Sequence, residues 1–245
     1  MDKVLSGTEL ASVKASWNSG EMVQNENKYN SNGHIQTRIS YKDYAAGLIS
    51  SQTDYVYEGE KLIQKEEMID LSSSSFAIQY SYSRTVFEYN NNRIIQQDHY
   101  LKEDDHYKLR SFTVFTYDNA GLPIKQSRYS ADGVLFGYIS YHYVDGNVVS
   151  SEEYKVTTTD VLATKQSYKY DNMKNPYRTM YHSVENIPFS VNMNNIIETN
   201  ATNYSINPPT GAGVLTTSQT TYGYNNDGFP STMNQNGNKF ILVYE

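Results

Sequence analysis

Hydrophobic and polar residues follow a repeating pattern along most of this chain. Each unit has two aromatic residues two positions apart, then an Asn/Asp/Gly-rich tetrapeptide, then one or two aliphatic residues. The clearest copies are YVYEGEKLI at 55–63, FEYNNNRII at 87–95, FTYDNAGLPI at 115–124, YHYVDGNVV at 141–149 and YGYNNDGFP at 222–230, with weaker copies KYNSNGHI at 28–35 and YKYDNMKNP at 168–176. The last step between copies is twice the usual one, so we expect a diverged copy near residue 197, where MNNIIETN at 193–200 keeps only the second half of the motif.

Each unit is typical of a β-hairpin. Aromatic residues two positions apart lie on one face of a strand, because side chains alternate with period 2. The Asn/Asp-Gly pieces supply residues that tolerate positive φ, which tight hairpin turns require. A second set of breakers, such as SADG at 130–133 and TTTD at 157–160, falls halfway between these turns. Subtracting two turns from a repeat of about 27 residues leaves two strands of roughly ten residues.

Eight such units predict an all-β fold, an antiparallel up-and-down meander of about 14–16 strands within one domain, 1–245. Closure into a soluble barrel removes the two exposed edges that a long sheet would otherwise present. An open, single-layer curled sheet is the alternative. One helix signal competes at the N-terminal end, where Ser6 and Glu9 have capping-box spacing before LASVKA.

The faces of the strands do not identify a lipid-facing wall. Along QYSYSRTVFEY one face carries Tyr80, Tyr82 and Val86, and the other carries Phe87 and Tyr89 among Gln and Ser, so both are mixed. A bilayer-embedded barrel needs a tall apolar band on its outer face. We therefore expect a barrel that does not span a membrane. The tyrosines are more simply explained as cross-strand packing pairs than as a ligand-stacking surface.

Composition narrows the function classes. The chain has 20 Lys+Arg against 27 Asp+Glu, a net charge of −7, and shows no basic stripe, so nucleic-acid binding is not expected. It has no cysteine, which excludes disulfides and thiol chemistry. Neither a signal peptide nor a lipid-anchor cysteine is present in this chain, and we expect that any such segment belongs to the native precursor.

Candidate catalytic and metal-binding groups are sparse. The five histidines, His34, His99, His106, His142 and His182, lack zinc-ligand spacing, and the acidic run Glu103 to Asp105 falls where a turn is expected. Glu66 with Glu67, and Glu152 with Glu153, are neighbours that point to opposite faces of a strand. Known phosphate-cradle and nucleophile motifs are missing from the sequence. We expect no metal, no cofactor and no catalytic residue.

The quoted units resemble the YD repeats of the RHS family of bacterial cell-surface proteins. The C-terminal order YKYDNMKNPY, then MNNII, then YGYNNDGFPSTMNQNGNKFILVYE is similar to uncharacterised bacterial surface lipoproteins, whose domain of unknown function has a porin-like β fold. The resemblance covers the chain from about residue 28 onward. It implies a barrel-like antiparallel sheet outside the cytoplasm, in the periplasm or at the cell surface, and it brings no catalytic residues.

An irregular excursion at about 175–217 interrupts the repeat. It holds four of the six prolines and a group of aromatic residues, and long excursions in a regular scaffold are often functional loops. The candidate ligand-binding residues are therefore Tyr177, Tyr181, Phe189 and Tyr204, packing over or into one mouth of the barrel. The sequence favours a non-enzymatic envelope protein with a binding or scaffold role, whose partner is a polysaccharide or another envelope protein. A glycan-acting enzyme is the second hypothesis and an outer-membrane channel the third.

Overall fold

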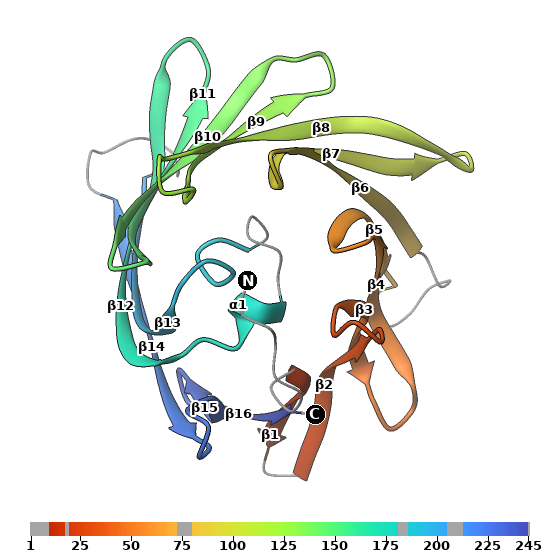
Figure 1. The fold of residues 1–245 in the computed structure, drawn as a ribbon, viewed down its shortest axis with the longest axis vertical. Coiled ribbons are helices and arrows are strands. Elements are labelled where there is room, and N and C mark those ends of the chain that lie inside the picture. Colours follow the sequence, from red (N-terminus) through yellow and green to blue (C-terminus); the bar gives the residue numbers. More distant parts are fainter. Residues whose placement is uncertain (1–9, 18–19, 73–79, 181–185, 205–212, 245) are drawn as a thin grey trace.

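The computed structural model describes residues 10–17, 20–72, 80–180, 186–204 and 213–244. These residues form sixteen antiparallel strands, and the sheet closes because β1 (Leu10–Trp17) pairs with β16 (Asn238–Tyr244). Every other pairing joins strands that follow each other in the chain, so the topology is up-and-down (Figure 1). The predicted all-β barrel of 14–16 strands is confirmed. The open curled sheet is excluded, because closure leaves no edge strand.

The elements between those two strands are regular. They are β2 (Gly20–Tyr29), β3 (Ile35–Asp43), β4 (Leu48–Glu58), β5 (Lys61–Asp70), β6 (Tyr80–Asn90), β7 (Arg93–Glu103), β8 (His106–Tyr117), β9 (Pro123–Ser130), β10 (Leu135–Val144), β11 (Asn147–Val156), β12 (Asp160–Lys174), α1 (Tyr177–Met180), β13 (Asn194–Asn203), β14 (Val214–Tyr224) and β15 (Pro230–Gln235). No helix among the described residues is long and apolar enough to cross a membrane. The LASVKA segment forms β1, so the competing helix is not formed there; Ser6 and Glu9 lie outside the described residues.

The turns use the residues that the motif predicted. Asn91 and Asn92, between β6 and β7, both have positive φ, and so do Asp145 and Gly146 between β10 and β11. These conformations match the twist of the flanking strands and suit Asn, Asp and Gly best. The predicted hairpin turns are confirmed at these positions.

A β-bulge recurs at the same place in all eight odd-numbered strands. Within its first three residues each strand has a residue that pairs with a tyrosine near the end of an even-numbered strand, and the next residue has no partner in that pairing. The bulged residues are Ala11, Gln36, Ile63, Ile95, Ile124, Val149, Ile197 and Ser231. A bulge locally disrupts the ladder, so a carbonyl beside it needs another donor.

Tyrosine hydroxyls supply these donors around the whole barrel. In each even-numbered strand one tyrosine hydroxyl donates to the carbonyl of the residue before the bulge on the preceding odd-numbered strand. The pairs are Tyr29 to Leu10, Tyr57 to Ile35, Tyr89 to Leu62, Tyr117 to Ile94, Tyr143 to Pro123, Tyr170 to Val148, Tyr222 to Ile196 and Tyr244 to Pro230. We call these eight residues the tyrosine ring. It explains why the repeat keeps a hydroxyl at this position.

The ring makes alkaline unfolding a testable property. Burial raises the pKa of Tyr117 to about 12, and it also raises the pKa values of Tyr143, Tyr170 and Tyr244. An unfolded tyrosine ionises near pH 10, so above that pH the unfolded state has lost protons that the folded state still holds. We expect full stability below pH 10 and a steep loss between pH 10 and 12, measured by urea unfolding at stepped pH. A constant free energy of unfolding across this window would contradict the burial of the ring.

Two features of the repeat differ from the prediction. Residues 193–200 are no diverged hairpin, because Asn194–Asn203 form β13, the return strand of the unit that begins at Tyr168 and Tyr170. The eighth unit is instead divided between the two chain ends, as β16 and β1. The irregular excursion also ends at Met193 rather than at about 217, since β13 and β14 pair with each other.

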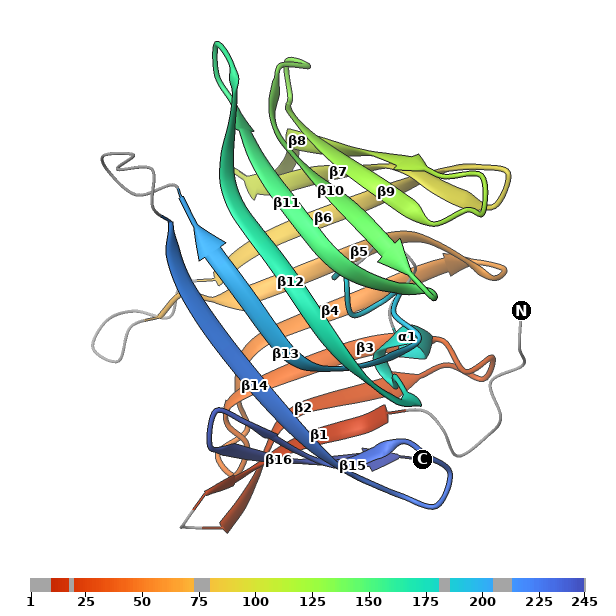
Figure 2. The same cartoon turned by 90° about the vertical axis from the view of Figure 1, so that its left-hand side faces the viewer.

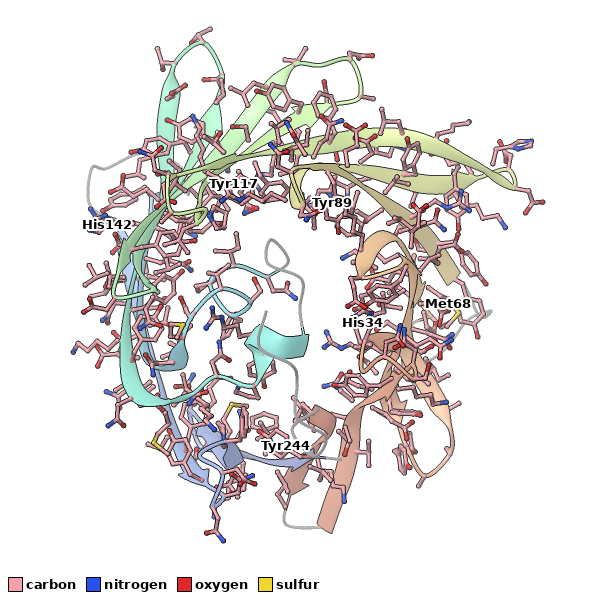
Figure 3. The ribbon with its side chains drawn as sticks, viewed as in Figure 1. His34, Met68, Tyr89, Tyr117, His142 and Tyr244 are labelled. Carbon is pink, nitrogen blue, oxygen red and sulfur yellow. The ribbon has the colours of Figure 1, made fainter. Side chains whose placement is uncertain are left out.

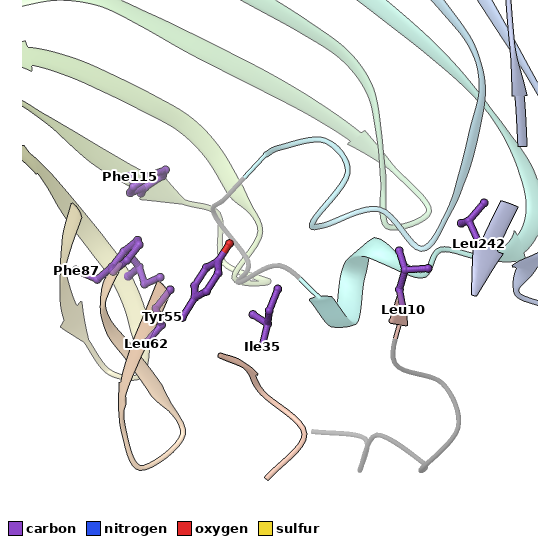
Figure 4. Close-up of a cluster of buried hydrophobic side chains, with 8 residues drawn as sticks. Leu10, Ile35, Tyr55, Leu62, Phe87, Phe115 and Leu242 are labelled. Atoms are coloured by element: carbon purple, nitrogen blue, oxygen red, sulfur yellow. The ribbon is translucent and has the colours of Figure 1, made fainter. Parts of the chain in front are cut away.

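The described residues of the excursion, 175–180 and 186–193, lie inside the barrel, and we call them the inserted segment. Sixteen strands enclose a space too wide for wall side chains to fill. Tyr177 of α1 packs against a buried cluster that includes Leu10, Leu62 and Phe87, lying on both sides of α1 in Figure 4. Ile187 and Val191 pack against a second cluster on β10–β13. The hydrophobic core is therefore a band of wall residues packed around this segment, close to the ring tyrosines Tyr29, Tyr57, Tyr89, Tyr117 and Tyr244. Figure 2 shows α1 of this segment inside one end of the barrel.

Candidate functional site

The lumen face carries polar side chains beyond the tyrosine ring. Figure 3 shows Tyr89, Tyr117 and Tyr244 on the inner side of the wall, with Met68 and His142 on its outer side. Residues two, four and six positions before a ring tyrosine share its face. In β4, β6 and β8 they are Tyr55, Thr53 and Ser51, then Phe87, Thr85 and Ser83, then Phe115, Thr113 and Ser111. The lumen wall thus changes from aromatic near the ring to hydroxyl-rich further along the barrel.

The larger lumen cavity, of about 590 Å³, lies between β1–β5, β15–β16 and the inserted segment. Its polar lining comes from Gln24, Asn25, Asn27, Arg38, Ser40, Ser51, Thr53, Lys65, Glu67 and Asn186, and its apolar lining from Leu10, Val13, Tyr55, Tyr177, Met233 and Phe240. Planar amide, guanidinium and carboxylate groups therefore face aromatic rings across one space.

A second cavity, of about 470 Å³, adjoins it on the β13–β15 side. Tyr177, Asn186 and Met233 line both spaces. Its other lining residues include Ile187, Phe189 and Tyr222, so this half is more apolar. The two cavities meet at Tyr177, Asn186 and Met233, and they give the interior one polar and one aromatic side.

Charged groups on the polar side lie in neighbouring cross-strand positions. Asn27, Arg38, Thr53 and Glu67 are consecutive register partners on β2 to β5. Arg38 Nε donates to Asn27 Oδ1 at 3.1 Å, which orients the guanidinium. Lys65 shares the face of Glu67 two residues away. The charged lining residues are the cations Arg38 and Lys65 and the anion Glu67, so the net charge of the cavity lining is about +1. The whole chain, in contrast, has a net charge of −7.

His99 extends this polar surface on β7. Its ring contacts Thr85 Oγ1 at 3.3 Å and Gln97 Nε2 at 3.3 Å. Burial lowers the pKa of His99, and the nearby Lys65 lowers it further. The imidazole is therefore neutral at pH 7, and it acts in the lumen as a hydrogen-bonding group rather than as a cation.

Asparagines hold the inserted segment in place. Asn192 is fully buried; its Oδ1 accepts the Val148 N–H at 2.8 Å and its Nδ2 donates to the Tyr170 hydroxyl at 2.9 Å. Asn147 Oδ1 accepts the N–H groups of Met193 and Asn194. Because these bonds tie the end of the inserted segment to β11 and β12, the lining residues of that segment are held in place.

A parallel network ties the start of the segment to the wall. Asn175 Nδ2 donates to the Phe189 and Asn192 carbonyls. Asp171 accepts from the Asn195 backbone N–H at 3.0 Å and from the Tyr224 hydroxyl. Tyr224 pairs with Pro230, at the position where other even-numbered strands carry a ring tyrosine, but its hydroxyl donates to Asp171. In β14 it is Tyr222 that donates to the carbonyl of the preceding strand, at Ile196.

The predicted site residues have different positions. Tyr177 and Phe189 lie together, with ring centroids 6.2 Å apart in an edge-on contact, and both line the second cavity. Tyr181 lies outside the described residues. Tyr204 follows the far end of β13, which rises about 3.3 Å per residue, so it lies roughly 30 Å along the strand from Asn194. Its inclusion in one site with Tyr177 is wrong, because β13 runs between them.

The other candidate groups occupy structural positions. Glu103 pairs with Lys108 and Arg110 beside the β7–β8 turn. Glu66 pairs with Arg84 on the outer face while Glu67 faces the lumen, so adjacent glutamates do point to opposite faces. Within the described ranges, no three His, Asp or Glu side chains converge as a metal site would require.

The aromatic repeat did not predict the polar lumen residues, although the sequence contains a signal for them. In three units the motif extends backwards as Ser-x-Thr-x-(Phe/Tyr)-x-Tyr, at 51–57, 83–89 and 111–117. The same period of 2 that places the aromatics together also places these hydroxyls on their face. Arg38, Lys65 and Glu67 carry no such pattern, because the odd-numbered strands shift register at the bulge.

Comparison with known proteins identifies solved structures with a similar fold. No family model and no curated protein matches this chain. A porin-like protein from Bacteroides uniformis aligns with a TM-score of 0.52 and 12% identity, over 95% of this chain and 96% of that one. Another porin-like protein, from Bacteroides vulgatus, aligns at 0.41 with 10% identity, over 97% and 99%. The first similarity shows that this chain folds like a porin-like barrel.

Proposed function

We propose that this protein is a non-enzymatic, extracytoplasmic protein of a bacterial envelope that binds a glycan inside its barrel. The observation that carries the proposal is the cavity of about 590 Å³ between β1–β5 and α1. Sugars present hydroxyls on their edges and C–H groups on their faces. Amide, guanidinium and carboxylate groups suit the edges, and Tyr55, Tyr177 and Phe240 suit the faces.

The outer face supports a wall that meets water rather than lipid. Ion pairs join β5 to β6 through Glu66 and Arg84, β11 to β12 through Glu152 and Lys165, and β12 to β13 through Lys169 and Glu198. All lie within the span of their strands. A lipid-facing barrel carries an apolar band about 25 Å tall there, and charges in it are costly. The proposal is therefore a barrel that does not span the membrane, with the channel as the weaker hypothesis.

The carboxylates support binding over hydrolysis. A glycosidase needs two carboxyl groups on either side of the scissile bond, about 5–10 Å apart. Glu67 is the one carboxylate among the described residues that line the larger cavity. Glu153 lines a separate small pocket and is paired with Arg128. We propose that Glu67 accepts hydrogen bonds from sugar hydroxyls and takes part in no covalent step.

The location and the family relationship are part of the proposal. The repeat resembles YD repeats of the RHS family, and the C-terminal order resembles bacterial surface lipoproteins. The porin-like fold of the Bacteroides uniformis protein agrees with an envelope setting. We propose a place in the periplasm or at the cell surface, with a lipid anchor in the native precursor, and another envelope protein as the alternative partner to a polysaccharide.

Glutamate substitutions on the two faces of β5 test the site. A thermal-shift screen with short oligosaccharides should identify a ligand, since a ligand at 100 times its Kd stabilises the native state by about 2.7 kcal/mol. We expect Glu67→Gln to weaken that ligand about 10- to 100-fold, because a hydrogen bond to a charged acceptor contributes about 1.5–3 kcal/mol. Titration calorimetry measures the change.

Glu66→Gln is the matched control, because it makes the same chemical change on the adjacent residue but on the outer face. Its affinity should stay within about twofold of the wild type. Equal losses in both variants, or no stabilisation by any oligosaccharide, would contradict lumen binding. Release of reducing sugar by the wild type, abolished in Glu67→Gln, would favour the enzyme hypothesis instead.

A further inference from the structure

Exposed apolar side chains gather at one end of the barrel. Eleven of the fifteen large hydrophobic residues that are exposed among the described residues lie within three residues of a strand end opposite the tyrosine ring. We call them the apolar collar: Tyr44, Leu48, Ile69, Leu71, Tyr80, Tyr82, Val134, Phe136, Val161, Val214 and Leu215. They come from β3–β6 and β9–β14, and the polar β7–β8 and β15–β16 turns interrupt them. Their clustering at one end calls for a contact that covers them.

The collar is apolar on both faces of the wall. Ile69 shares the lumen face of Lys65 and Glu67, and Val214 shares that of Thr220. Tyr82 and Leu215 are each one residue out of phase with those faces, so they point outward. A partner lying against the side of the barrel would cover the outer face alone. Apolar residues on both faces are expected where the rim of a barrel inserts into the apolar part of a lipid layer, because lipid then contacts both faces.

The net charge of the collar distinguishes between the possible partners: a second copy of the chain, an anionic lipid surface and a zwitterionic lipid surface. Its segments, 42–48, 69–72, 80–82, 130–136, 156–161 and 213–215, contain one lysine and four aspartates, Lys42, Asp43, Asp70, Asp132 and Asp160, which gives −3. Two copies joined end to end would bring two such rims together and repel each other. Anionic lipid headgroups would be repelled as well. A zwitterionic surface carries no net charge and allows the apolar side chains to insert.

Tyrosines such as Tyr80 and Tyr82, with an apolar ring and a polar tip, are typical of the interfacial region of a bilayer.

We propose that the apolar collar docks this barrel, end on, onto the surface of a zwitterionic lipid bilayer. The wall itself stays in water, and the collar inserts only to interfacial depth, so the contact is peripheral. The opposite end, with the tyrosine ring, then faces away from the lipid. This inference does not depend on the glycan site.

Vesicle flotation with the full chain tests the proposal. Phosphatidylcholine vesicles should carry the wild type upward, and vesicles containing phosphatidylglycerol should carry less of it. Serine substitution of Val134 and Phe136, or of Val214 and Leu215, should reduce partition into phosphatidylcholine vesicles about tenfold, because exposed apolar area is removed. These side chains are solvent-exposed, so the fold should tolerate either pair, and far-UV circular dichroism checks it.

A variant with Val56→Ser and Val144→Ser is the matched control, since both valines are exposed but lie near the tyrosine ring. It should float like the wild type. Equal loss of flotation in this control, or no wild-type flotation with phosphatidylcholine, would overturn the proposal. Preferred flotation with the anionic vesicles would do the same. So would a concentration-dependent dimer, seen by sedimentation and lost in the collar variants, because it would assign the collar to a second copy.

Discussion

A barrel with phenylalanine at Tyr57, Tyr89, Tyr117 and Tyr143 is expected to lose roughly 4–8 kcal/mol of unfolding free energy. Each hydroxyl donates to a backbone carbonyl beside a bulge, at 2.5–2.9 Å. Phenylalanine preserves the packing of the ring and removes only the donor. The carbonyl then stays without this partner in a half-buried place, which costs about 1–2 kcal/mol at each site.

The combined loss from the four substitutions approaches the whole free energy of unfolding of an ordinary domain, about 5–15 kcal/mol. Urea unfolding followed by circular dichroism measures it, with the four single variants giving the increments. Tyr80→Phe combined with Tyr82→Phe is the control, because both side chains are exposed at the other end of the barrel. A quadruple variant within about 1 kcal/mol of the wild type would show that water satisfies these carbonyls and that the ring is dispensable.

Asn192→Ala is expected to cost about 2–4 kcal/mol, the largest loss that we predict for a single substitution. The change leaves the Val148 N–H without its acceptor and removes a donor to the Tyr170 hydroxyl, both in a fully buried place. Burying an unsatisfied amide is costly, and the missing side chain also leaves a void. Because Asn192 anchors the inserted segment to the wall, glycan binding in the lumen should weaken as well.

Hydrogen exchange of the Val148 amide reports the lost bond directly, and chemical denaturation gives the free energy. Asn200→Ala is the control: Asn200 donates to Glu198 on the outer wall, where its loss should cost less than about 0.5 kcal/mol. Unchanged exchange at Val148 would mean that another acceptor replaces Asn192. The inserted segment would then be anchored mainly by Asn147 and Asn175.

The candidate site was predictable only in part. The excursion with Tyr177 and Phe189 stood out in the sequence because it broke the repeat, and both residues do lie in the lumen. Tyr204 was grouped with them by closeness in sequence, yet a ten-residue strand separates them. Arg38, Lys65 and Glu67 gave no sign of forming one surface, since their meeting depends on the register of three strands.

The asparagines show the same limit. In the sequence alone, MNNII resembles a diverged copy of the repeat. In the fold, Asn192, Asn194 and Asn195 are the anchors of the inserted segment, and Ile196 takes the place of an ordinary return-strand residue. Side-chain hydrogen bonds between residues more than twenty positions apart leave no local pattern to read.

The sequence by itself determined a count of about 14–16 strands, the up-and-down order and the turns. Those properties are local: a period of 2 sets the faces, and Asn, Asp and Gly set the turns. The tertiary structure alone decided that the sheet closes β16 onto β1, that residues 175–180 and 186–193 lie in the lumen, and which polar groups meet beside them. Closure and filling depend on the width and the shift of the whole ring of strands, and every strand contributes to both.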